Sequence, residues 1–142
     1  MHVPELDKAV AELARVLKPG GVLLIGETNR DAPVIRLRWL YWRLTRRRGA
    51  EVEHLSGQTH TWLEDKGNKL FVRQVSLDWM ASRFEARGLN RWWTNTGDLT
   101  ELYVSGRLGG RSFFLWLNSL WFRLGGSPRL AAVFYMAFRK PS

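Results

Sequence analysis

Four polar residues, Glu27, Thr28, Asn29 and Arg30, follow an apolar run at residues 22–25 and one glycine. Polar residues at the carboxyl end of a buried strand commonly contact substrate, because ligands of open α/β sheets bind beyond those strand ends. Substrate binding is therefore one interpretation of these four side chains. The other is an ordinary solvated loop that caps the following helix.

Two histidines, His54 and His60, raise the question of a metal site. Their spacing fits no strong ligand pattern, and the nearest carboxylates are not arranged like a known site. The chain has no cysteine, so it forms neither a disulfide nor a thiolate metal site. We therefore expect no metal. The sequence also lacks a Ser/His/Asp motif and a nucleophile elbow.

The residues that precede the polar loop predict the elements that position it. Residues 4–17 carry apolar side chains at helical spacing, and Pro19-Gly20-Gly21 ends that helix. Residues 22–25 are wholly apolar. Such a run is typical of a strand covered on both faces, as in a parallel α/β sheet.

The middle of the chain predicts a helix and a hairpin. Residues 33–48 have the spacing of a helix with two oily faces, because its tryptophans lie outside the main apolar stripe. Residues 59–63 and 70–75 are expected to be strands around turn residues at 65–68. These elements would follow the polar loop directly.

The last part of the chain predicts alternating helices and strands. Ser76 caps an expected helix that ends before Gly88, and residues 91–96 form a strand. Residues 111–124 predict a short, very oily helix, and residues 129–139 the final strand. Without an internal repeat or a linker, residues 1–142 are expected to form one domain.

The stretch "HVPELDKAVAELARVLKPGGVLLIGE" resembles the second half of class I S-adenosylmethionine-dependent methyltransferases. In that family a segment such as His-Val-Pro ends one strand, and a helix with a characteristic pattern leads to the next. The predicted helix at 76–88 and the last two strands match the family's last helix and its antiparallel strand pair more loosely. The residues that match the helix pattern are Leu6, Ala9, Glu12, Arg15, Val16, Leu17, Lys18, Pro19, Gly20 and Gly21.

The resemblance implies an α/β fold, the C-terminal half of a Rossmann-like, seven-stranded methyltransferase domain, and S-adenosylmethionine as cofactor. In the family, a Gly-rich loop after the first strand and an acidic residue after the second hold the cofactor. This sequence contains no G-x-G-x-x-G motif. We therefore expect a truncated or split methyltransferase whose N-terminal, cofactor-binding half is absent, and which is inactive as an isolated chain.

The resemblance also assigns the substrate side. His2 borders the family's reaction cleft, where it is a candidate base, and the alternative is a frayed terminal residue. Residues 36–75 lie where the family often inserts a substrate lid. His54 and His60 are therefore substrate-side candidates, with plain surface histidines as the alternative. The oily faces of this region favour a small acceptor, hydrophobic or lipid-like.

The net charge of +9 favours polyanionic partners. Residues 36–48, "RLRWLYWRLTRRR", interleave arginines with tryptophans, which suits an anionic membrane surface or a stacked nucleic acid. No recognised nucleic-acid module supports the latter. A non-catalytic, lipid-interacting peripheral membrane module is thus the alternative function. The competing explanation for the oily helix is packing against Phe113, Trp116 and Trp121.

Two expectations concern location and assembly. The chain shows neither a signal peptide nor a membrane-spanning run, so we expect a cytoplasmic protein with membrane association. Without the first half of the domain, the strand at 22–25 would be an apolar edge strand, with no proline or lysine to block pairing. We therefore expect self-association through this edge, or a need for a complementing N-terminal half.

Overall fold

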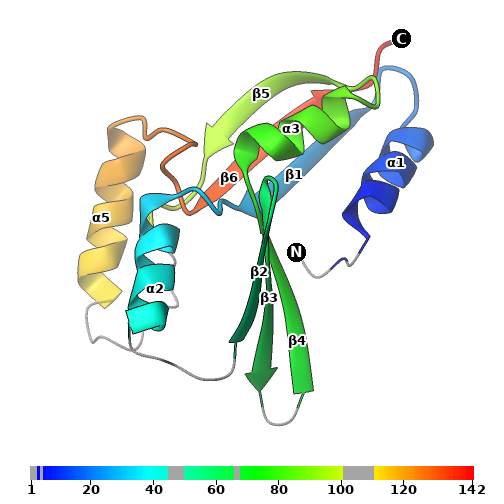
Figure 1. The fold of residues 1–142 in the computed structure, drawn as a ribbon. Helices are drawn as coiled ribbons and strands as arrows, with labels where there is room; N and C mark the ends of the chain where they lie inside the picture. The colour runs from blue at the N-terminus through cyan, green and yellow to red at the C-terminus, as the bar shows by residue number, and fades with distance from the viewer. Residues whose placement is uncertain (1–2, 4, 45–49, 66–67, 101–110) are drawn as a thin grey trace.

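The computed structural model describes residues 3, 5–44, 50–65, 68–100 and 111–142 (Figure 1). Helices and two separate three-stranded sheets make a mixed α/β fold, which confirms the predicted class. In chain order the elements are α1 (Leu6–Val16), β1 (Val22–Thr28), α2 (Pro33–Leu44), β2 (Ala50–Leu55), β3 (Gln58–Asp65), β4 (Asn68–Val75), α3 (Leu77–Glu85), β5 (Asn90–Thr96), α5 (Arg111–Arg123) and β6 (Val133–Arg139).

The first sheet, sheet A, has the strand order β1-β6-β5. The central strand β6 is antiparallel to both neighbours, and its register with β1 runs from Val22 opposite Arg139 to Thr28 opposite Val133. The last two strands, compared above with the family's antiparallel pair, are antiparallel to each other, and β6 is the neighbour of the strand at 22–25. Within the described residues, the other edge of this strand carries only one bridge, from Asn29 to Val75.

The second sheet, sheet B, is an antiparallel meander of β2, β3 and β4. The predicted hairpin at 59–75 is confirmed, whereas β2 was missed because its glutamates and histidine hide the strand pattern. The bridge between Asn29 and Val75 attaches sheet B to the carboxyl end of β1, and Figure 1 shows sheet B extending away from sheet A at that point.

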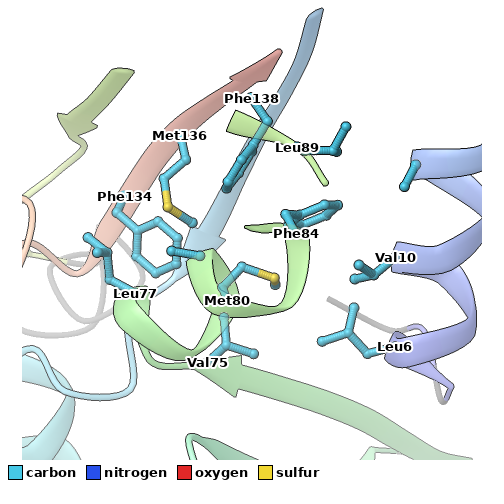
Figure 2. Close-up of a cluster of buried hydrophobic side chains, with 12 residues drawn as sticks. Leu6, Val10, Val75, Leu77, Met80, Phe84, Leu89, Phe134, Met136 and Phe138 are labelled. Atoms are coloured by element: carbon cyan, nitrogen blue, oxygen red, sulfur yellow. The ribbon is translucent and has the colours of Figure 1, made fainter. Parts of the chain in front are cut away.

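The hydrophobic core lies between the inner face of sheet A and the helices α1 and α3 (Figure 2). Phe84 of α3 packs on Phe138 of β6 with ring centroids 4.8 Å apart. The predicted cap holds α3 in place, because the Ser76 hydroxyl accepts from the Trp79 N–H. Buried core side chains include Leu6, Val10, Met80, Phe84, Phe134, Met136 and Phe138.

The prediction that the strand at 22–25 is covered on both faces was wrong. Only its inner side meets the core, and Val22 and Leu24 on the outer side are 49% and 63% exposed. The register places Tyr135 opposite Gly26 on the same outer face, where it is also exposed. The physical reason is that α1 and α3 both pack against the inner face.

Element ends also differ from the sequence-based expectation. β1 continues to Thr28, so Glu27 and Thr28 belong to the strand rather than to a loop. β6 begins at Val133 instead of residue 129, because the N–H groups of Leu130 and Ala131 turn back to Ser127 O. The described part of α2 ends at Leu44, and the remainder of the predicted helix lies outside the described residues.

Candidate functional site

A buried carboxyl and a buried guanidinium meet where the two sheets join. Asn29 bridges Val75, so the residues two positions earlier on each strand, Glu27 and Arg73, approach each other. Glu27 is 9% and Arg73 2% exposed. Burial raises the pKa of Glu27, and the attraction of Arg73 opposes that rise. Burial also lowers the pKa of Arg73, with Glu27 among the groups that oppose it. This site therefore holds a carboxyl and a guanidinium that attract each other and are both largely shielded from water.

Sheet B extends this pair into a row of polar side chains. Glu53, His60 and Arg73 lie directly opposite one another on β2, β3 and β4. Arg73 Nε donates to His60 Nε2 at 3.1 Å, and His60 Nδ1 lies 3.4 Å from Glu53 Oε2. Burial and the positive charge of Arg73 lower the pKa of His60. We call Glu53, His60, Arg73 and Glu27 the polar row.

The chemistry of the polar row follows from these contacts. A guanidinium only donates, so His60 Nε2 must accept and Nδ1 carries the proton toward Glu53. The rings of Trp62 and Phe71 stand edge-on to the imidazole, at 6.0 and 5.2 Å between centroids. The row thus presents a neutral histidine, a fixed cation and a carboxyl with a raised pKa, which can orient a polar group or accept its proton.

Asn29 and Arg30, predicted to contact substrate, hold segments of the chain together. Asn29 Nδ2 donates to the backbone carbonyls of Arg129 and Ala131 at 2.9 and 3.2 Å. Its Oδ1 accepts from Asp31 N–H at 3.0 Å. These bonds fasten the end of β1 to the segment before β6.

Arg30 makes the corresponding attachment on the other side. Its Nη1 donates to the carbonyl oxygens of Leu55 and Gln58, at the turn between β2 and β3. Thr28 pairs with Val133 at the end of β1. These residues therefore fix the position of sheet B and the polar row, and a direct substrate contact for them stays a prediction.

The two predicted histidines lie on opposite faces of sheet B. His60 faces Arg73, whereas His54 is exposed and its Nδ1 lies 3.3 Å from Thr59 Oγ1. His2 lies outside the described residues. Of the residues predicted for the substrate side, the structure therefore joins Glu27 and His60 in the polar row.

Arg73 and Glu53 are the members that the sequence reasoning missed. β4 alternates with a period of two, and Arg73 shares a face with the apolar Phe71 and Val75. A charged residue at an apolar position of a strand indicates a buried partner, and that signal was readable in the sequence. Across the described ranges, no three His, Cys, Asp or Glu side chains gather in a way that would hold a metal ion.

The N-terminal residues of the chain resemble known methyltransferases in sequence. Residues 1–25 match the sequence profile of the family described as Methyltransferase domain. This match confirms the resemblance to class I S-adenosylmethionine-dependent methyltransferases for α1 and the start of β1. No curated protein sequence matches the chain.

Solved structures give a more distant likeness. An S-adenosylmethionine-dependent methyltransferase from Clostridium acetobutylicum ATCC 824 is 9% identical, with a TM-score of 0.47 over 96% of this chain and 51% of that one. The CcbJ methyltransferase from Streptomyces caelestis is 11% identical, with a TM-score of 0.45 over 94% and 52% of the two chains. The chain thus spans about half the length of these methyltransferases.

Proposed function

We propose that this chain forms the acceptor side of an S-adenosylmethionine-dependent methyltransferase, with the polar row beside the acceptor. The supporting observation is the methyltransferase-domain match over residues 1–25, which runs directly into β1. The carboxyl end of that strand carries Glu27, the buried end of the polar row. In open α/β folds this strand end is where ligands bind.

The described residues do not fit the nucleoside cofactor itself. A nucleoside needs glycines that let the backbone approach closely, and residues 29–32 after β1 contain none. Gly20 and Gly21 lie before β1, at the opposite strand end. The Gly20 N–H donates to Lys140 O at 3.0 Å, and a Cβ on Gly21 would come within 2.7 Å of Lys18 O. The cofactor would therefore be held by other residues, in a further segment or a second chain.

The part that this chain plays is positioning and proton handling. Arg73 and His60 would orient a polar group of the acceptor, since together they offer a fixed donor and a neutral ring. A proton released from the acceptor atom would pass to the Glu27 carboxylate. Burial raises the pKa of this carboxyl toward neutral pH, and a general base works best when its pKa lies near the working pH. A small, hydrophobic acceptor fits the aromatic rings beside His60.

The outer face and free edge of sheet A would receive the cofactor-binding part. Leu24 and Trp92 are 63% and 58% exposed, on an apolar face that soluble domains usually cover. The free edge of β1 offers backbone N–H and C=O groups to a further strand. The lid role for residues 36–75 stays a prediction. The structure shows that α2 and sheet B occupy most of that range.

The test is a binding and turnover measurement on two proteins. One is the 142-residue chain. The other is a fusion that places the first half of a class I methyltransferase, with its Gly-rich loop, before this chain. Isothermal titration with S-adenosylmethionine should give no low-micromolar binding to the chain and clear binding to the fusion. Tight binding to the isolated chain would contradict this division of roles, and a folded fusion that does not bind would contradict the function.

Variants of the fusion separate the two halves of the proposal. Glu27→Gln should leave cofactor binding unchanged and lower methyl transfer to an added acceptor by at least about tenfold. Glu12→Gln is the matched control, because Glu12 is exposed on α1 and forms its ion pair with Arg15, one helical turn away on the same surface. If both variants transfer methyl groups equally well, Glu27 has no role at the acceptor.

A further inference from the structure

Positive charge is concentrated in two stretches of the chain. Residues 32–50 and 102–142 contain no Asp or Glu and carry 12 of the 22 Lys and Arg side chains. The rest of the chain holds all 13 acidic residues and only 10 basic ones. The net charge of +9 therefore comes from these two stretches. α2 lies in the first of them and α5 in the second.

The helix α2 presents a stripe of apolar side chains to solvent. Its other side is fixed, because Ile35 is 1% exposed and the Trp39 indole N–H donates to the Gln74 side chain at 3.1 Å. The exposed stripe recurs at helical spacing along the opposite side. Its members are Leu37, Leu40, Tyr41 and Leu44, of which Leu44 is 73% exposed.

The helix α5 presents aromatic side chains in the same way. Asn118 is its one buried residue, and its side-chain oxygen accepts from the Thr100 N–H at 3.1 Å. The Trp121 indole N–H donates to Thr96 Oγ1 at 2.8 Å, which fixes the rotation of the helix. Phe113 and Trp116 are 57% and 58% exposed, so more than half of each residue is open to solvent.

The two helices lie at one end of the molecule. α2 begins just after β1 ends, and the segment that follows α5 leads to β6, whose first residue pairs with the last residue of β1. α1 joins the other end of the same strand. Figure 1 shows α2 and α5 at the end of the molecule away from α1. We call the exposed side chains of α2 and α5 the oily surface.

We propose that the oily surface docks the protein on an anionic lipid membrane. The arginines in and beside α2 and α5 attract the lipid headgroups, and aromatic and leucine side chains enter the headgroup boundary. Arg139 and Lys140 lie at the other end of sheet A, beside α1, and take no part in this attraction. The leucines of α2 distinguish a membrane from a nucleic acid, because they can neither pair with phosphate nor stack on a base. No helix in the described part is long and apolar enough to cross a bilayer, so the helices would lie in the interface.

This proposal does not depend on methyl transfer. Both helices adjoin the carboxyl end of β1, where Glu27 and the polar row lie. Docking would therefore hold that end of sheet A near the lipid. A lipid-interacting protein without catalytic activity would use the same surface in the same way.

The test is cosedimentation of the 142-residue chain with vesicles of phosphatidylcholine alone and with phosphatidylglycerol added. The expected result is binding to the anionic vesicles that falls steeply with salt, because screening weakens the attraction. The double variant Phe113→Ser/Trp116→Ser should bind about tenfold more weakly. Trp92→Ser is the matched control, since Trp92 is also 58% exposed but lies on sheet A. It should bind like the unmodified chain.

Three results with vesicles would overturn the proposal. These are equal and salt-insensitive binding to both kinds of vesicle, an absence of binding, and an equal loss in the Trp92 control. A single-stranded oligonucleotide that binds more tightly than anionic vesicles, with the double variant unaffected, would also overturn it. Circular dichroism of each variant checks that a loss of binding is not a loss of fold.

Discussion

The helices α3 and α5 are both rich in apolar residues, yet one is buried and the other is largely exposed. α3 places Met80 and Phe84 in the core against sheet A, at 0% and 2% exposure. α5 is apolar around most of its circumference but buries Asn118. A helix that is apolar on all sides needs more than one covering surface, and α5 has one contact side in the described structure. Apolar content therefore predicted both helices, but not which of them is buried.

The largest expected difference between the two helices is in stability. Phe84→Ala should lower the free energy of unfolding by about 3–5 kcal/mol, because it leaves a cavity beside Phe138. Phe122→Ala in α5 should change it by about 0.5 kcal/mol or less, since that side chain is half exposed. Urea unfolding followed by circular dichroism measures both. Equal losses would mean that α5 is covered in solution, and the comparison would fail.

Replacing a buried charged side chain should destabilise the fold more than replacing an exposed aromatic side chain. Arg73→Met removes the partner of Glu27 and the donor to His60, and should cost about 3 kcal/mol. Adding Glu27→Gln should restore part of that loss, because the buried carboxylate that Arg73 attracts is then gone. A double-mutant cycle in urea gives the coupling directly. Additive effects of the two substitutions would show that the pair does not interact.

The polar row should also make stability depend on pH. The pKa of His60 is lowered below its ordinary 6.5 by burial and by Arg73, so the folded state disfavours the protonated ring. The contribution of His60 to the free energy of unfolding is complete above pH 6.5. It is lost as the pH falls from 6.5 to the lower pKa of the folded state.

The stability contributed by Glu27 changes with pH in the opposite direction, so the effects of Glu27 and His60 can be measured separately. The pKa of Glu27 is raised above 4.5, so its contribution is present below that pH and is lost as the pH rises through the folded pKa. In a Glu27→Gln background, the urea midpoint should fall on acidification from about pH 7.5 to about pH 5.5. His60→Gln should flatten that slope.

The smallest effect on stability is expected on the outer face of sheet A. Leu24→Lys replaces a side chain that is already 63% exposed, so the unfolding midpoint should hardly move. The same change should reduce self-association in light scattering, since a lysine on an edge strand blocks pairing. Unchanged scattering would show that this edge takes no part in assembly. Hydrogen exchange along β1 then reports whether its amides are covered.

The sequence predicted the elements that have a local signal. The Ser76 cap marks α3, and the Pro19-Gly20-Gly21 turn separates α1 from β1. It could not predict the polar row, because His60 and Arg73 meet only through the register of β3 and β4. Nor could it predict that Asn29 bonds to carbonyl oxygens about a hundred residues away. Contacts between distant segments leave no periodic pattern along the chain.

The central place of β6 has a consequence for synthesis on the ribosome. β1 is synthesised before β6, so the pairing of Val22 with Arg139 cannot form until the end of β6 has been made. Long-range pairing of this kind slows folding, because a large loop must close before the contacts form. During translation β1 and β5 both lack their shared neighbour, with leucine and tryptophan side chains in water. A nascent chain stalled before residue 133 would expose both strands to aggregation and to chaperones.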